Sequence, residues 1–260
     1  MRKNKKNDLI EALTQFELWG YLARQDIKTR YRRSKIGPFW ITISMAIFCG
    51  ALGAVYSRLF GVEISELLPF ISIGMVVWSL VAGVIGEMPT LYVEAAPFIK
   101  DIKINLITIL FRAVGKSLII FSHNLIIVVG IYLYFGIWPG WIGLIAIPGF
   151  FLVLMNLVAI GLPLAILGAR FRDVSQITQS ILQVIFFITP IFWFPRALSK
   201  DSWIISFNPA THYLDLIRSP LLGQFPTNES WMVSILIFIS CLILATPVYR
   251  KNGPRVAFWV

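Results

Sequence analysis

Charged side chains are scarce in this sequence of 260 residues. They make up 14% of it, and hydrophobic residues make up 57%. An ordinary soluble domain has about 25% charged residues. The mean hydropathy is +0.77. A water-soluble fold of this size covers its surface largely with polar groups, which these few charges cannot do. We therefore exclude a single soluble domain and expect lipid to be the solvent.

Cysteine and histidine are also rare, with two residues of each. Cys49 and Cys241 lie in apolar stretches, where a thiol packs as a small hydrophobic group. The sequence contains neither the His-Glu-x-x-His pattern of metalloproteases nor the Gly-x-Ser-x-Gly pattern of serine hydrolases. We expect no disulfide, no metal site and no catalytic residue in this chain.

Acidic residues are absent from every long apolar run. A proton or ion relay needs Asp, Glu or His inside the bilayer, so ion-coupled transport is disfavoured. Gly115, Lys116 and Ser117 resemble the end of a phosphate-binding loop, but Leu110 stands where that motif needs a glycine. If the protein performs driven transport, another chain has to hydrolyse the ATP.

Long runs without Asp, Glu, Lys or Arg dominate the rest of the sequence. About 20 such residues cross the ~30 Å hydrocarbon core as a helix. The longest run, 117–169, suits two crossings joined at Trp138-Pro139-Gly140-Trp141. Barrel strands would alternate apolar and polar residues, which these runs do not. We predict an all-α integral membrane protein with six transmembrane helices, at about 38–58, 67–87, 110–137, 141–168, 176–194 and 231–249.

Lysine and arginine are distributed unevenly between the two sides of these spans. Nineteen of the 23 lie in the N-terminal segment, the second and fourth connections and the C-terminal tail. The other side holds four, namely Arg58, Arg196, Lys200 and Arg218. The positive-inside rule makes segment 1–35 a cytosolic interface segment, 36–250 the six-span domain and 251–260 a cytosolic tail. The net charge of +10 is thereby explained without nucleic acid.

The N-terminal segment combines an amphipathic pattern with a basic cluster. Leu9, Leu13 and Phe16 begin a helical spacing over 8–31 that predicts a helix in the cytosolic interface. The cations that follow are Arg30, Arg32, Arg33 and Lys35. They are either a topogenic cluster near anionic headgroups or a pocket for the pyrophosphate of a lipid-linked substrate. The sequence leaves both interpretations open.

Two further features concern the ends of the spans. We expect Arg112 and Lys116, in the third span, to extend to the cytosolic headgroups. On the outer side, segment 195–230 is long, apolar and rich in proline. It predicts two short re-entrant helices, around 203–207 and 213–217, that dip into the outer leaflet and are too short to cross it.

Four segments carry a family resemblance. They are Tyr31–Trp40, Ala169–Asp173, Thr189–Phe192, and Asn208-Pro209 together with Ile217-Arg218. In this order, and over essentially the whole chain, they resemble the type-2 ABC exporter permeases, above all the branch that exports O-antigen, capsule and teichoic acid. The resemblance implies a homodimer of six-span subunits in the bacterial inner membrane. It also implies two copies of a separate ATPase, which binds ATP and Mg.

The same resemblance implies roles for individual residues. The substrate would be a polysaccharide on an undecaprenyl pyrophosphate carrier. Aromatic rings suit a neutral sugar chain, and the candidate rings are Trp40, Tyr56, Phe60 and Trp78. The alternative interpretation is that these rings face lipid. Segment 88–103 would hold the coupling helix that contacts the ATPase, with Glu94, Phe98, Lys100 and Asp101. Arg170, Arg172 and Asp173 would form the cytosolic gate.

Two alternatives stay open at this point. A type-2 permease for a drug or a small lipid would share the fold and differ in substrate. A membrane-embedded enzyme of lipid or sugar metabolism would need a catalytic cluster, and Asp201, His212 and Asp215 in the outer segment come nearest to one.

Overall fold

A computed structural model describes residues 6–195 and 203–260 as a bundle of helices, and no strand occurs among these residues. Five stretches are long and apolar enough to cross a membrane. They are α3 (Phe39–Phe60), α4 (Ile64–Glu94), α6 (Leu106–Phe135), η1 (Gly140–Ile145) with α7 (Ala146–Arg170), and α11 (Asn228–Asn252) with the short turns after it. The prediction of an all-α multi-pass membrane protein is confirmed.

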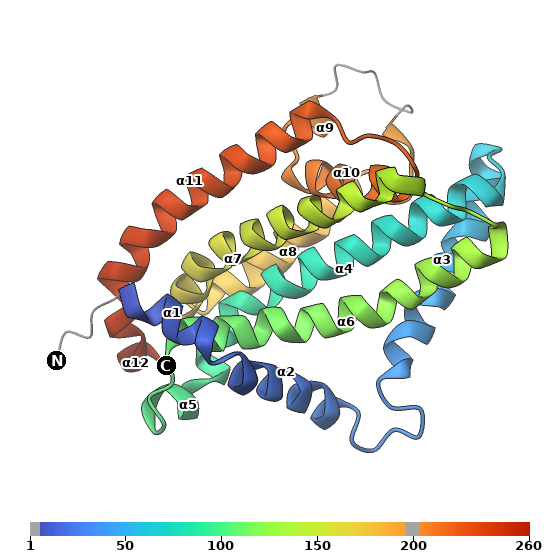
Figure 1. The fold of residues 1–260 in the computed structure, drawn as a ribbon. Coiled ribbons are helices and arrows are strands. Elements are labelled where there is room, and N and C mark those ends of the chain that lie inside the picture. Colours follow the sequence, from blue (N-terminus) through green and yellow to red (C-terminus); the bar gives the residue numbers. More distant parts are fainter. Residues whose placement is uncertain (1–5, 196–202) are drawn as a thin grey trace.

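The shorter helices lie at the two ends of this bundle or beside it. They are α1 (Lys6–Thr14), α2 (Phe16–Arg30), α5 (Ala96–Lys100), α8 (Asp173–Ile188), α9 (Trp203–Ser206), α10 (Pro209–Leu221), η3 (Gly253–Arg255) and α12 (Val256–Trp259). Figure 1 places α1, α5 and α12 at one end of the bundle and α9 and α10 at the other. The first and last helices therefore lie at the same end. We call it the cytosolic end and the opposite end the outer end, after the orientation that the positive-inside rule predicts.

α8 is shorter than the span predicted for 176–194. It begins three residues earlier and ends at Ile188, and its 16 residues rise about 24 Å. It ends there because Pro190 disfavours a helical backbone at Thr189, whose ψ is 135°. α8 nevertheless runs from the end that holds α5 and α12 toward the end that holds α10 (Figure 1). A sixth crossing at this place stays a prediction.

The N-terminal amphipathic segment is two helices and not the single helix predicted over 8–31. The break lies at Gln15, between α1 and α2. Thr108 of α6 donates a hydrogen bond to the Gln15 side chain (3.2 Å), and the Trp19 indole donates across the break to the carbonyl of Ala12 (3.1 Å). Both helices therefore pack along the cytosolic half of α6, and their position in the interface stays a prediction.

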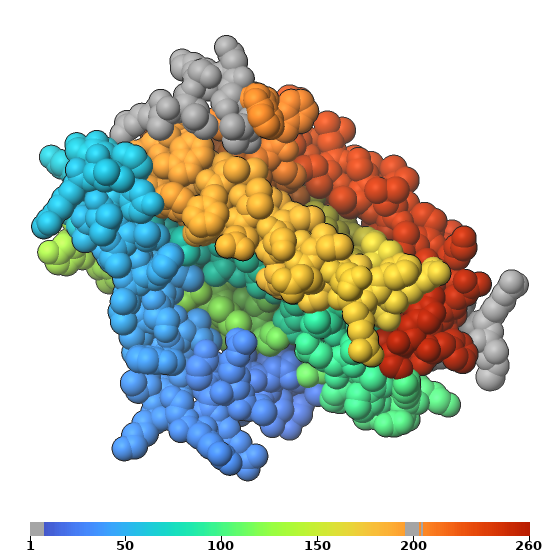
Figure 2. Space-filling view, turned by 180° about the vertical axis from the view of Figure 1, so that it is seen from behind, coloured from blue at the N-terminus to red at the C-terminus, as the bar shows by residue number. Residues whose placement is uncertain are grey.

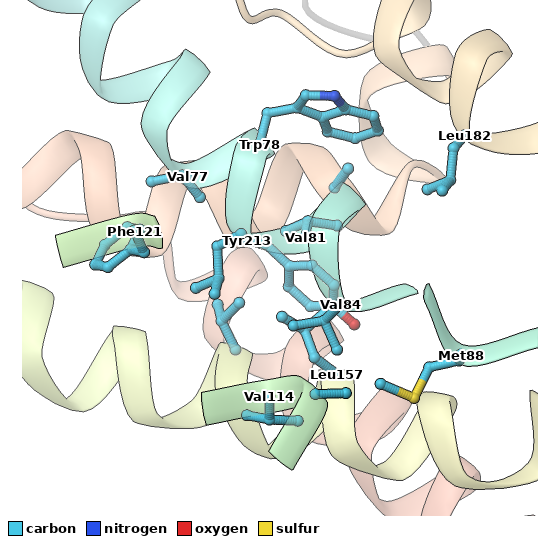
Figure 3. Close-up of a cluster of buried hydrophobic side chains, with 14 of the residues drawn as sticks. Val77, Trp78, Val81, Val84, Met88, Val114, Phe121, Leu157, Leu182 and Tyr213 are labelled. Carbon is cyan, nitrogen blue, oxygen red and sulfur yellow. The ribbon is translucent and has the colours of Figure 1, made fainter. Parts of the chain in front are cut away.

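α4 is the central helix. It packs against α3, α6, α7, α8 and α10, and the residues from Leu67 to Val84 are nearly all buried. Figure 3 shows that Val77, Trp78, Val81 and Val84 of α4 meet side chains from the surrounding helices. These partners are Val114 and Phe121 of α6, Leu157 of α7, Leu182 of α8 and Tyr213 of α10. Most other helices leave one side for lipid or for a partner, as the exposed Ile47, Val55 and Leu59 of α3 illustrate.

The turn predicted between the third and fourth spans is built from glycine. Gly136 ends α6 at φ 66°, and Gly140 begins η1 at φ 62°. Both backbones lie in the left-handed region that favours glycine. Trp138 and Trp141 beside them are each 87% exposed, at the end of the bundle that also holds α10.

Glycines in α7 allow its close contact with α4. A Cβ on Gly168 would lie 2.0 Å from the carbonyl oxygen of Pro89, and one on Gly161 would lie 2.9 Å from the sulfur of Met88. Helices approach so closely only where one of them carries no side chain. The cytosolic ends of α4 and α7 are thereby held together.

We expect Gly168→Ala to lower the free energy of unfolding by about 1–3 kcal/mol, because the added methyl group meets backbone and not a movable side chain. Thermal unfolding of the purified chain in detergent, followed by tryptophan fluorescence, measures this. Gly130→Ala is the control, since nothing lies within 4 Å of its Cβ position. Equal stability of the two variants would contradict the close approach.

Candidate functional site

A hollow between α3 and α8 is the most extended feature of one face of the molecule. Figure 2 shows α3, in blue to cyan, and α8, in yellow to orange, on its two sides, with α4 and α6 at its floor. At the outer end, α3 contacts the segment that follows α8, where the ring centroids of Tyr56 and Phe192 are 5.3 Å apart. We refer to this feature as the α3–α8 hollow.

Small residues lie on the accessible face in the middle of α4. Ser79, Gly83 and Gly86 follow each other at intervals of four and three, which places them on one face of the helix. They keep some exposure while most of their neighbours are buried. Asn124 of α6 donates to the Ser79 hydroxyl (3.3 Å), and Gln179 of α8 donates to the Gly86 carbonyl (3.0 Å). This face offers neutral polar groups and little bulk.

An aromatic cluster connects α3, α4 and the end of α8. Three of the four predicted rings belong to it, since Tyr56 contacts Phe60 (5.4 Å between centroids) and Phe192, and Trp78 contacts Phe186 (5.6 Å). Phe186 and Phe192 join these pairs into one group (5.6 Å). Sequence reasoning missed both as site residues, although Phe192 is in the Thr189–Phe192 motif.

Trp40 lies apart from this cluster. It belongs to the first turn of α3, sixteen residues and about 24 Å along the helix from Tyr56, and is 48% exposed. Trp78 is almost completely buried. The four rings therefore occupy three different environments, and Tyr56 and Phe60 are the two that border the α3–α8 hollow near its outer end.

Arg112 connects three elements at the cytosolic end. Its guanidinium group donates two hydrogen bonds to Asp26 of α2, at 2.8 and 2.6 Å. The same group lies 5.1 Å from the ring centroid of Phe98, in α5. A bidentate ion pair fixes the orientation of both partners, and a cation over a ring adds to it. α2, α5 and α6 are therefore joined through one side chain.

A second ion pair lies deeper between α4 and α6. Lys116 donates to Glu87 at 2.5 Å, and both side chains are mostly buried. Arg112 and Lys116 each have an acidic partner that the sequence analysis did not identify, and their position at the headgroups stays a prediction. The sequence held one signal for these ion pairs, because opposite charges lie within about three turns of the cytosolic ends of neighbouring helices.

The basic cluster lies at the far end of α2 from this junction. Arg30 is the last residue of α2, and Arg32, Arg33 and Lys35 follow in the turn before α3. All four are exposed, and none of them forms an ion pair within the described part of the chain. Their charge is available to an anion at the cytosolic side of the molecule.

The residues predicted for coupling surround α5. Glu94 is the last residue of α4, and it is exposed, as are Lys100 at the end of α5 and Asp101 after it. Phe98 is half-buried beneath Arg112. Exposed charged residues therefore surround α5 and are accessible to a partner. Phe98 already contacts Arg112 of α6.

The predicted gate residues lie on the cytosolic connection between α7 and α8. The Arg170 guanidinium group is 5.0 Å from the ring centroid of Phe171 and 5.5 Å from that of Trp259 in α12. Arg172 and Asp173 are exposed, and Asp173 begins α8, where a negative charge stabilises the helix. The structure joins this connection to the C-terminal helix and not to the basic cluster.

At the outer end, two of the resembling motifs meet. Asn208 donates to the Thr189 hydroxyl (2.8 Å), and Arg218 donates to the Pro190 carbonyl (2.6 Å). Arg218 is buried, 3.8 Å from the ring centroid of Phe70, and does not lie free in an outer loop. Of the other predicted outer cations, Arg196 and Lys200 lie outside the described residues. α10 is thereby fastened to the irregular segment after α8.

Asp215 fastens α10 to the start of α11. Although burial raises its pKa, hydrogen bonds from Ser219, Ser230 and Thr227 outweigh that effect and hold the pKa below its usual range. His212 contacts the Ser230 hydroxyl (3.1 Å) and the Ser206 carbonyl (2.9 Å). Asp201 lies outside the described residues. His212 and Asp215 thus serve the packing of short outer helices, which is no arrangement for catalysis.

Comparison with known proteins decides the family. A family model described as "ABC-2 type transporter" matches residues 17–222. The chain belongs to the ABC-2 type transporter family. It is also 23% identical over 260 residues to the "O-antigen export system permease protein RfbA" of Myxococcus xanthus, covering 96% of this chain and 98% of that protein.

Membership fixes the general role of the chain. An ABC-2 permease is a membrane transport subunit without an ATPase domain, and it works with ABC ATPase subunits. The prediction that this chain is a permease and not an enzyme is confirmed. The matched range includes α2, the α3–α8 hollow, α5 and the outer helix α10.

We expect Asp26→Asn to lower the free energy of unfolding by about 1.5–3 kcal/mol, because it leaves the partly buried Arg112 without its anionic partner. Exchanging the two charges, Asp26→Arg with Arg112→Asp, should recover part of the loss in a double-mutant cycle. Glu17→Gln, on an exposed position of α2, is the control. If the effects of Asp26→Arg and Arg112→Asp on the free energy of unfolding were additive, this would contradict the ion pair.

The low pKa of Asp215 predicts an acid-sensitive outer segment. A carboxyl group whose pKa is lowered by folding stabilises the fold above its usual pKa of 3.8, and this stabilisation is lost as the pH falls through the lower folded value. Asp215→Asn should therefore be less stable than wild type near neutral pH, with the difference shrinking below about pH 4. A constant difference in thermal unfolding down to about pH 3 would contradict this.

Proposed function

We propose that this permease exports a polysaccharide carried on undecaprenyl pyrophosphate, O-antigen or a related polymer, across the bacterial inner membrane. The observation that carries the proposal is the α3–α8 hollow, which combines aromatic rings with small and neutral polar residues and has a basic cluster near its cytosolic side. The similarity to a protein named as an O-antigen export permease supports the same substrate class.

The surface of the hollow suits a sugar chain. Hydroxyl groups of a polysaccharide bind neutral acceptors and donors such as Ser79 and Gln179. Sugar rings also pack on aromatic faces such as Tyr56 and Phe60. The charged groups nearby, Lys116 and Glu87, neutralise each other. A neutral polymer can move along such a surface without a strong electrostatic binding site that would hold it.

The basic cluster suits the pyrophosphate of the carrier. Arg32 and Arg33 present planar guanidinium groups that bind phosphate oxygens in pairs. They lie between the interfacial helix α2 and the start of α3, so a phosphate at headgroup depth reaches them without leaving the membrane surface. Trp40, one turn into α3, suits the boundary between headgroups and hydrocarbon.

Energy enters from the partner ATPase, which binds ATP and Mg. We propose that α5 and the exposed Glu94, Lys100 and Asp101 contact this subunit. Movement of α5 then reaches α6 and α2 through Phe98, Arg112 and Asp26. Arg170, Arg172 and Asp173 border the cytosolic entrance on the opposite side of the hollow.

The assembly we propose is a homodimer with two ATPase subunits. α8 and residues 189–194 make the sixth crossing, and both termini are cytosolic. The exposed apolar side of α3 supports a second copy of the chain as the partner that closes the hollow into a path. Export of a drug or a small lipid is the second candidate, since the family membership alone does not select the cargo.

A strain that lacks the gene tests this proposal. Surface polysaccharide is quantified, and the cytosolic side is probed for the same polymer attached to its lipid carrier. We expect loss at the surface with accumulation inside, reversed by the intact gene. Unchanged surface polymer would overturn the polysaccharide assignment in favour of the drug or small-lipid exporter.

Substitution of the basic cluster tests the pyrophosphate contact in the same strain. Arg32→Ala with Arg33→Ala should reduce export about a hundredfold at normal protein level, since two charge-assisted phosphate contacts of about 1.5 kcal/mol each are lost. Arg58→Ala, an exposed cation at the other end of α3, is the matched control. Normal export by the double variant would contradict the pyrophosphate contact and would leave membrane orientation as the role of the cluster.

A further inference from the structure

A second cavity lies on a different side of the bundle, between α1, α6, α7 and α11. Its volume is about 1120 Å³. Leu110 of α6, Val158 and Ala159 of α7, and Leu242 and Ala245 of α11 are among the residues that line it. None of these residues borders the aromatic cluster or belongs to the predicted substrate site. The cavity is thus separate from the α3–α8 hollow.

The cavity is apolar and opens to the surface. Leu9 and Leu13 of α1, Met155 of α7 and Leu242 of α11 line it, and each is between 47% and 55% exposed. Four half-exposed apolar side chains from three helices converge on one space. In a membrane protein such a space is filled by hydrocarbon and not by water.

The position of the cavity corresponds to one leaflet. Along α11 its lining runs from Phe238 to Arg250, twelve residues and about 18 Å of helix. This is close to half of the ~30 Å hydrocarbon core. The lining ends at the end of the bundle that holds α1 and α12. The cavity therefore has the depth of a single acyl chain from that leaflet.

α1 covers the polar end of the cavity. Asp8 accepts hydrogen bonds from Asn105 at the start of α6, through its carbonyl (2.8 Å), and from Tyr249 of α11, through its carboxylate (2.9 Å). These bonds fasten α1 across the space between α6 and α11. Arg250, at the same end, lines the cavity and supplies a cation at headgroup depth.

We propose that this cavity binds a phospholipid of the leaflet that faces α1, with an acyl chain between α6, α7 and α11 and its phosphodiester beside Arg250. The lipid completes the contact between α11 and the rest of the bundle. It covers the apolar side of α1, which explains why this amphipathic helix folds over the cavity and continues into α2. The site is independent of the exported substrate.

Photolabelling tests this site. The full-length chain is reconstituted in vesicles of phosphatidylethanolamine and phosphatidylglycerol that contain a trace of phosphatidylglycerol with a photoactivatable acyl chain. We expect labelled peptides to concentrate around Leu13, Met155 and Leu242, above the labelling of Leu236 and Ile243, which are exposed on α11 and do not line the cavity. Equal labelling of the two regions would overturn the proposal, since both would then be ordinary lipid-facing surface.

Two variants separate the cavity from its surroundings. Ala159→Phe with Ala245→Phe fills the space and should abolish the excess labelling, whereas Ser240→Phe, on an exposed position of α11, should not. Arg250→Gln keeps the cavity and should lower the labelling about tenfold, because it removes one charge-assisted contact with the phosphate. Undiminished labelling in both the filled variant and Arg250→Gln would overturn the proposal even if α1 is labelled.

Discussion

The fold depends on one constraint, which is that every charge taken toward the hydrocarbon finds its partner inside the protein. A charged side chain at a span centre costs about 2.5–3.5 kcal/mol or more when it is alone. Lys116 meets Glu87, and Arg112 meets Asp26. Arg218, at the other end, binds a backbone carbonyl and lies over a phenylalanine ring. Ion pairs thus lie toward one end of the bundle and a buried, hydrogen-bonded arginine at the other, which leaves the middle of the α3–α8 hollow to neutral groups.

The same pairs determine which elements move together. Arg112 joins α2, α5 and α6, while Gly168 keeps the backbone of α7 against Pro89 of α4. In the proposed mechanism a displacement of α5 would reach α6 and α2 through Arg112, and the close contact of α4 with α7 would resist it. Such an arrangement lets a subunit outside the membrane act on the border of the hollow. In this proposal the chain contributes the path for the substrate and the helix α5, which transmits the movement of the partner.

Much of the fold could be predicted from the sequence because it follows from local chemistry. Apolar runs of 20 residues are helices in lipid whatever surrounds them, and Pro139 and Gly140 mark a reversal by their own backbone preferences. The length of α8 was missed although Pro190 was visible, because hydropathy continues past the point where the backbone leaves the helix. The partners of Arg112 and Lys116 were missed because pairing depends on which helices are neighbours, which no single run reveals.

The candidate site likewise combines features that single residues reveal with features that only the fold reveals. Tyr56 and Phe60 were selected by residue type, but the contact of Tyr56 with Phe192 depends on where the irregular segment after α8 lies. Thr189, Asn208 and Arg218 were noted as parts of separate motifs, and only the fold brings them into one cluster. Trp78 carries the same chemistry as Tyr56 and is buried, because the centre of α4 lies on the axis of the bundle. The residue type therefore indicated which interactions a side chain can make, and its neighbours in the fold decided whether the side chain lies at the hollow or in the core.

The central claim is that this chain provides the path while ATP hydrolysis in a partner provides the energy. The most direct test places the permease, its ATPase partner and lipid-linked polysaccharide in sealed vesicles, and measures polymer that crosses the membrane. The account predicts transport that requires ATP and continues when an ionophore collapses the proton gradient. Transport driven by an imposed proton gradient without ATP would contradict it, because the paired Glu87 and Lys116 would then have to act as a relay.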